Sequence, residues 1–125
     1  MKIRKILIVD DEKTITSYLE KKLAKLGYAV STAEDGEQAL EKAFADLPDL
    51  VLLDVKLPIL NGHEVCRKLR ADSRTATIPV LMLSAKAQSD EIDQGLASGA
   101  DKYLCKPMGF PDILKEIKEF ETDRE

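Results

Sequence analysis

The length and composition of the chain restrict it to one small globular unit. A chain of 125 residues can bury one core but has no room for a second domain beside it. With 44% hydrophobic and 34% charged residues, it is neither disordered nor fibrous nor dependent on disulfides. The net charge of −4, with acidic and basic residues mixed along the chain, provides no basic stripe, so we expect no direct nucleic-acid binding.

The first residues and the cysteines favour a cytoplasmic location. The apolar run that follows the basic N-terminus extends only from Ile6 to Val9, which is too short for a signal peptide or a membrane span. We therefore expect no membrane association. Cys66 and Cys105 lie far apart, without a metal-binding spacing, and we interpret both as reduced packing residues.

Short runs rich in β-branched and apolar residues alternate with longer segments of helical period, and this alternation occurs five times. We expect strands at residues 4–10, 28–32, 49–54, 79–84 and 101–105. The first, third and fourth runs are apolar nearly throughout, which is typical of central parallel strands that are covered on both faces. These three strands should form the middle of the sheet.

Apolar residues recur every three or four positions in the intervening segments, which predicts amphipathic helices. The expected core-facing sets are Ile15, Leu19, Leu23 and Leu26; Ala39, Leu40, Ala43, Phe44 and Leu47; Val65, Cys66 and Leu69; and Ile113, Leu114, Ile117 and Phe120. Gly27 should end the first helix, and Pro111 should start the fifth. The fourth helix, near residues 88–98, has few apolar anchors such as Leu96 and contains Gly95, which costs about 1 kcal/mol relative to Ala. We expect it to be the loosest helix.

The alternation of strands and helices predicts the fold class. Repeated strand–helix–strand units give a parallel sheet with right-handed crossovers and helices on both faces. We expect an α/β fold with a doubly wound, five-stranded parallel sheet of flavodoxin-like type, strand order 2-1-3-4-5, and five helices. No linker interrupts the chain before an acidic tail from Glu119 to Glu125, so residues 1–125 should form one domain with a core from about 4 to 121.

The expected strand ends carry the polar residues of a candidate site. Ligands of open parallel sheets bind outside the carboxyl ends of the strands. Asp10 and Asp11 follow the first strand, Asp54 ends the third, Ser84 ends the fourth and Lys106 follows the fifth. Because the first and third strands are neighbours in the expected order, their three carboxylates should meet in one crevice. Acidic residues in this place argue against a flavin-phosphate loop or a Walker loop.

Three carboxylates in one crevice repel one another and are tolerated when a cation neutralises them. Oxygen ligands without histidine or cysteine favour a hard ion, and Mg²⁺ fits because it binds one or two carboxylates together with water and phosphate oxygens. A carboxylate beside the ion can attack phosphorus and form an aspartyl phosphate. Lys106 and Ser84 could then bind the phosphoryl oxygens.

Four motifs at the strand ends are jointly very specific. They are Asp10-Asp11 after ILIV, Asp54 in LLDVKLPILNG, Ser84-Ala85 after VLML, and Lys106-Pro107 after GADKYLC. Together they resemble the signature of the receiver domains of two-component response regulators, and of chemotaxis regulators in particular. The resemblance extends over nearly the whole chain, from about Lys5 to Phe120.

The resemblance implies a role for each of these residues. Asp54 would accept a phosphoryl group from a phosphohistidine of a sensor kinase or phosphotransfer protein. The domain would catalyse its own phosphorylation and dephosphorylation without being a metabolic enzyme. The implied Mg²⁺ site consists of Asp11, Asp54 and the Lys56 carbonyl, with Asp10 holding a metal-bound water. The implied switch residues are Ser84 and Tyr103, the phosphate-binding cation is Lys106, and the loop residues are Pro58, Gly62 and Pro107.

The chain also departs from the family pattern. Met108-Gly109-Phe110 stands where the family commonly has Phe and a small or acidic residue, and the last helix lacks the arginines with which receivers joined to winged-helix domains dimerise. We therefore expect a monomer or weak dimer that acts on an unknown downstream protein. The lack of a linker after Phe120 slightly favours a stand-alone regulator.

Two other functions stay open. A phosphatase or phosphomutase with an aspartyl nucleophile usually needs a second acid two residues on, where this chain has Lys56. A pseudo-receiver would use the same fold only as a protein-binding scaffold, and failure to bind magnesium would support it. Lys56 and Lys86 each lie two residues beyond a site residue, where they could shield a phosphoryl group from water. We interpret His63, the only histidine, as a solvated surface residue.

Overall fold

A five-stranded parallel sheet forms the centre of the computed structural model, which describes residues 2–84, 89–105 and 109–123. The strands are β1 (Lys5–Val9), β2 (Ala29–Ala33), β3 (Leu50–Asp54), β4 (Val80–Ser84) and β5 (Lys102–Cys105). Their order is β2-β1-β3-β4-β5, and every pairing is parallel. The predicted fold class and strand order are confirmed.

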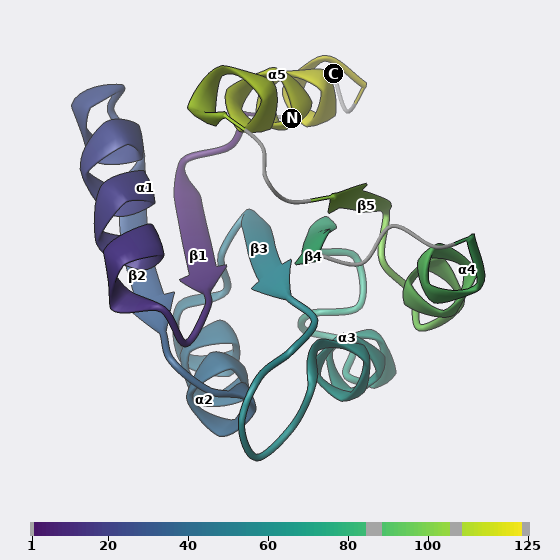
Figure 1. Cartoon of the computed structure of the whole chain (residues 1–125). Helices are drawn as coiled ribbons and strands as arrows, with labels where there is room; N and C mark the ends of the chain where they lie inside the picture. Colours follow the sequence, from purple (N-terminus) through teal and green to yellow (C-terminus); the bar gives the residue numbers. More distant parts are fainter. Residues whose placement is uncertain (1, 85–88, 106–108, 124–125) are drawn as a thin grey trace.

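Helices cover both faces of this sheet (Figure 1). The helices are α1 (Lys13–Lys25), α2 (Gly36–Asp46), α3 (Gly62–Ala71), α4 (Ser89–Ala97) and α5 (Phe110–Asp123). The helices α1 and α5 cover one face, α2 and α3 cover the other, and α4 lies beside the edge strand β5. No helix within the described ranges is long and apolar enough to cross a membrane.

Successive residues of the central strands enter two different cores. On β1, Leu7 and Val9 pack with α2 and α3, whereas Ile6 and Ile8 pack with α1 and α5. The strands β3 and β4 are also buried along their whole length. Burial of each such side chain contributes about 1.5–3 kcal/mol. This explains why their sequences are apolar nearly throughout and why they form the middle of the sheet.

Three leucines that were expected to face the core are instead exposed. Leu26, Leu47 and Leu96 are 54%, 45% and 43% exposed, respectively. Leu26 and Leu47 are C-cap residues, and Leu47 has a left-handed φ of 48°. The helical period no longer applies at such positions because the chain has already left the helix. The predicted acidic tail is also corrected, since α5 continues to Asp123.

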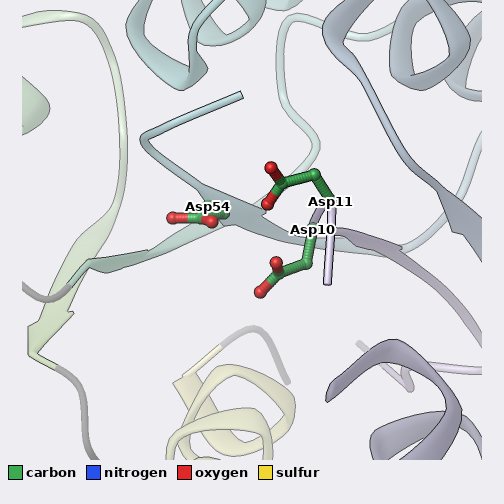
Figure 2. A group of neighbouring side chains, drawn as sticks. All are labelled: Asp10, Asp11 and Asp54. Atoms are coloured by element: carbon green, nitrogen blue, oxygen red, sulfur yellow. The ribbon is translucent and has the colours of Figure 1, made fainter. Parts of the chain in front are cut away.

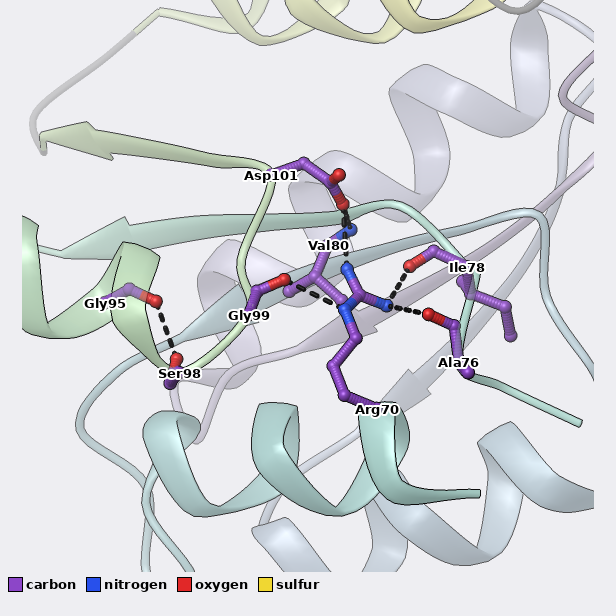
Figure 3. Close-up of polar contacts among 8 residues, drawn as sticks. All are labelled: Arg70, Ala76, Ile78, Val80, Gly95, Ser98, Gly99 and Asp101. Atoms are coloured by element: carbon purple, nitrogen blue, oxygen red, sulfur yellow. Dashed lines mark hydrogen bonds and ion pairs between the residues drawn. The ribbon is translucent and has the colours of Figure 1, made fainter. Parts of the chain in front are cut away.

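Arg70, at the end of α3, holds the starts of β4 and β5 together (Figure 3). Its guanidinium group donates to the carbonyls of Gly99 at 2.9 Å and Ile78 at 2.6 Å, and to Asp101 Oδ2 at 2.9 Å. The same Asp101 oxygen accepts from the Val80 N–H at 2.8 Å. This network fixes the edge of the sheet opposite the strand ends that carry Ser84 and Cys105.

Candidate functional site

The carboxylates that follow β1 and end β3 meet at one edge of the sheet (Figure 2). Asp10 and Asp11 come directly after β1, which pairs with β3 through Val9 opposite Leu53. One oxygen from each of Asp10, Asp11 and Asp54 lies within 4.8 Å of the others. Asp10 and Asp54 are buried, whereas Asp11 is exposed. The crevice of three carboxylates is therefore present where the strand ends predicted it.

Backbone groups hold the two buried carboxylates in place. The Glu12 N–H donates to Asp10 Oδ1 at 3.0 Å, and the Lys56 N–H donates to Asp54 Oδ1 at 3.4 Å. In the described part of the chain, the cluster offers only oxygen ligands, and this donor set fits a hard cation such as Mg²⁺.

Gly62 allows the loop after Asp54 to return against the strand. Its N–H donates to the Val55 carbonyl at 2.8 Å. A Cβ at this position would lie 2.5 Å from the Asp54 carbonyl oxygen and 2.8 Å from the Val55 Cα. Asn61 caps the following helix α3 in a capping box with Glu64. The loop that carries Pro58 is therefore fixed at both ends.

A cavity of about 710 Å³ opens beside the acidic cluster. Its lining includes Asp11, Lys56, Pro58, His63, Ser84 and Tyr103. Five of these six residues were predicted to lie at the site, whereas His63 was predicted to be a solvated surface residue. The imidazole instead lies against the cavity with its Nε2 buried. Gly62 could have indicated the position of His63, because the close approach of Gly62 to β3 brings the next residue to the site.

The ring of Tyr103 in β5 packs over Gly95 in α4. A Cβ on Gly95 would lie 2.5 Å from Tyr103 Cδ2 and 3.2 Å from Met82 Sδ. From the sequence, Gly95 was predicted only to destabilise the helix. The structure gives it a packing role, since only a residue without a side chain leaves room for the ring.

Several predicted residues lie outside the part of the chain that the structure describes. Lys86, Lys106 and Pro107 belong to this group, so their roles stay predictions. Both cysteines are described and free, and burial raises the pKa of the Cys66 thiol. Cys66 belongs to the core on the α2 and α3 side of the sheet.

The fold and site together define a class of protein: a flavodoxin-like α/β domain with an acidic, oxygen-only cluster at the switch point of its sheet. The family model of the response regulator receiver domain matches residues 6–118. The chain therefore belongs to the family of receiver domains of two-component response regulators.

Solved and curated relatives agree with this assignment. The chemotaxis response regulator CheY4 of Vibrio cholerae superposes with a TM-score of 0.89 at 33% identity, covering 94% of this chain and 98% of that chain. A CheY-like receiver domain protein of Methanospirillum hungatei gives a TM-score of 0.90 at 30% identity, covering 98% and 96%. The alkaline phosphatase synthesis transcriptional regulatory protein PhoP of Bacillus subtilis is 45% identical over 115 residues, which are 92% of this chain and 47% of PhoP.

These relatives correct one expectation about partners. PhoP is a transcriptional regulator, and RpaA of Synechocystis, 43% identical over 96% of this chain and 51% of its own length, is named as a DNA-binding transcriptional regulator. The chain spans about half the length of these curated relatives. The expectation of no direct nucleic-acid binding is therefore wrong, because the charge balance of 125 residues says nothing about the other half of such proteins. Because the chain spans only about half of these relatives, the lack of a linker after Phe120 no longer favours a stand-alone regulator. No comparison supports the pseudo-receiver alternative.

Proposed function

We propose that Asp54 accepts a phosphoryl group from a phosphohistidine of a sensor kinase or phosphotransfer protein in a Mg²⁺-dependent reaction. The observation that carries this proposal is the cluster of Asp10, Asp11 and Asp54 in a chain of the receiver family. The P–N bond of the phosphohistidine breaks as a bond forms between phosphorus and an Asp54 carboxylate oxygen. The imidazole leaves and takes up a proton from water.

The remaining residues bind and orient the phosphoryl group in this proposal. Asp11, Asp54 and the Lys56 carbonyl would hold Mg²⁺, and Asp10 would orient one of its waters. When bound, the ion supplies positive charge that neutralises the carboxylates and the transferred oxygens. The Ser84 hydroxyl and the Lys106 ammonium group would donate to these oxygens, which is most of what phosphoryl transfer requires of a protein.

The loop and switch residues complete the proposal. Pro58, Gly62 and Pro107 would shape the loops around the acceptor, and Lys56 with Lys86 would limit the access of water. Ser84 and Tyr103 would change position when Asp54 is phosphorylated, and the domain, with its core at about 4–121, would later catalyse loss of the group. In the whole protein this switch would control transcription, as the names of the relatives PhoP and RpaA suggest. It would act in the cytoplasm.

Mass spectrometry after incubation with acetyl phosphate and Mg²⁺ tests the proposal. The wild-type chain should gain the mass of one phosphoryl group. The Asp54→Asn variant should gain none, because its amide is isosteric with the carboxylate but is a poor nucleophile. Undiminished labelling of this variant would refute the assignment of the acceptor.

A further inference from the structure

The loop between β3 and α3 contains a strained residue whose side chain faces solvent. Ile59 has a φ of 72° and is 65% exposed. The Leu60 N–H donates to the Pro58 carbonyl at 2.8 Å, which closes a three-residue turn around Ile59. A γ-turn whose central residue has a positive φ is rare and strained, and a β-branched residue is poorly suited to this conformation.

Neighbouring elements hold this turn in shape. The Gly36 N–H, at the start of α2, donates to the Pro58 carbonyl at 3.4 Å. A Cβ on Gly36 would lie only 2.4 Å from the Leu60 carbonyl oxygen, so α2 and the turn are in close contact. On the other side, Asn61 is fixed as the cap of α3. Ile59 is thus presented to solvent on a rigid base.

The turn stands at the entrance to the proposed acceptor site. Asp54 is only 9% exposed, and Pro58 lines the cavity beside it. Asp11 of the acidic cluster and Val55, next to Asp54, also line this cavity. In the proposed reaction the phosphohistidine approaches Asp54 from the cavity, and the protein surface around the histidine lies against the residues at its rim. Ile59, next to Pro58, is more exposed than the other large apolar side chains in the described part of the chain.

We propose that Ile59 is an apolar anchor for the protein that donates the phosphoryl group. The occupant is a surface of the donor that carries apolar side chains beside its phosphohistidine. This inference rests on the proposed function of Asp54. Ile59 acts by docking and does not touch the phosphoryl group, so it affects transfer from a protein donor but not transfer from a small donor. Backbone strain at a surface residue that packing holds in place is often found at such functional sites.

The test compares two donors on two matched variants. Phosphoramidate has the P–N bond of phosphohistidine but no protein surface. The protein donor is the autophosphorylated kinase that labels the wild-type chain fastest among the purified histidine kinases of the source organism. The variant is Ile59→Asn, since Asn adopts a positive φ more readily than most residues and should keep the turn. The control is Leu47→Asn, because Leu47 is also exposed with a positive φ of 48° but lies at the end of α2 remote from Asp54.

The measured quantity is the rate of transfer from the kinase divided by the rate from phosphoramidate. This ratio should fall about fivefold or more in Ile59→Asn and stay at the wild-type value in Leu47→Asn. An unchanged ratio in Ile59→Asn, or an equal fall in both variants, overturns the proposal. If phosphoramidate labels the wild type but no kinase does, the docking proposal fails while Asp54 stands as acceptor. If neither donor labels the wild type, the proposed function itself fails.

Discussion

At the scale of single residues, Gly62 determines how closely α3 can approach the strand that ends in Asp54. The atoms that an added Cβ would meet are the Asp54 carbonyl oxygen and the Val55 Cα, at 2.5 Å and 2.8 Å. Both belong to the backbone and cannot rotate away, so a larger residue must displace the loop or the strand. The resemblance to receiver domains marked Gly62 as a loop residue, and its contact distances supply the physical reason.

We therefore predict that Gly62→Ala lowers the free energy of unfolding by about 1–3 kcal/mol, the usual cost of overpacking a rigid contact. Phosphorylation of Asp54 by acetyl phosphate should also slow, because the carboxylate moves with its backbone. Urea denaturation measures the first effect. The control is Gly109→Ala, since the nearest atom to its Cβ would lie at an ordinary 3.5 Å. Equal stabilities of the two variants would show that the contact at Gly62 relaxes without cost.

At the scale of elements, α4 and β5 are joined where the Tyr103 ring lies over Gly95. In an exposed helix interior, replacing Gly by Ala stabilises by about 1 kcal/mol. Here the added Cβ would lie 2.5 Å from the ring, so we predict the opposite sign for Gly95→Ala, a loss of about 1–3 kcal/mol. The double variant Gly95→Ala with Tyr103→Ser, compared with Tyr103→Ser alone, measures the coupling in a cycle of urea denaturations. If Gly95→Ala destabilises as much without the ring as with it, the contact is not the cause.

A second junction ties β5 to α5. Lys102 Nζ lies 2.6 Å from Glu116 Oε2 and 2.7 Å from Glu119 Oε2. The hydrogen bonds that Lys102 donates to Glu116 and Glu119 raise the pKa of Lys102, and the bond to Glu119 lowers the pKa of that carboxyl from its usual 4.5. The Glu119 contribution to stability is therefore present above about pH 4.5 and is lost as the pH falls through its folded pKa. The Lys102 contribution is present below its ordinary pKa of 10.5 and is lost above it.

The directions of these two pKa shifts predict how the loss of stability in Lys102→Met depends on pH. The difference in melting temperature between wild type and variant should be constant between about pH 6 and about pH 9, because neither the Glu119 nor the Lys102 contribution to stability is lost in this range. It should shrink as the pH falls toward about 3, since protonation of Glu119 removes the ion pair from the wild type as well. Thermal denaturation followed by circular dichroism gives the comparison. A difference that grows in acid would contradict the direction of the Glu119 shift.

The sequence predicted the elements and the acidic cluster because both depend on local rules. Apolar runs mark the buried strands, and parallel strands bring their carboxyl ends to one edge, so Asp10 and Asp54 could be placed together. Arg70 could not be found in this way, because besides Asp101 it binds the backbone carbonyls of Ile78 and Gly99, and contacts to backbone carbonyls leave no pattern in the sequence. The strained turn at Ile59 depends likewise on packing against Gly36, which lies 23 positions earlier in the chain.

At the scale of the whole molecule, the acidic cluster should set the response of stability to magnesium. Mg²⁺ at about 100 times its dissociation constant stabilises a folded protein by about 2.7 kcal/mol, and the wild-type melting temperature should rise accordingly. The Asp11→Ala variant should lose this rise. In metal-free buffer it should be no less stable than wild type, because removing one of three neighbouring carboxylates relieves repulsion. A clear drop in its melting temperature without metal would instead give Asp11 a structural role.

The last prediction concerns where a signal leaves the domain. A phosphoryl group on Asp54 adds charge and acceptor oxygens near Ser84, and the coupling free energy of such switches is typically 1–3 kcal/mol. We expect Ser84 to turn toward the phosphate and Tyr103 to move into the space beside it. Because the Tyr103 ring lies against Gly95, its movement must alter the contact between β5 and α4.

Beryllium fluoride with Mg²⁺ mimics the phosphoryl group, so backbone amide shifts with and without it map this change. Beyond the immediate site, large changes should cluster in residues 84–118, which include α4, β5 and most of α5. Gly95→Ala should reduce the changes in α4, since it disturbs the contact that would transmit them. This is a shift of population between two packings, and it requires that the phosphoryl mimic bind one of them better. Changes concentrated on α1 and α2, or confined to Asp54 and its direct neighbours, would show that the signal does not leave through α4 and β5.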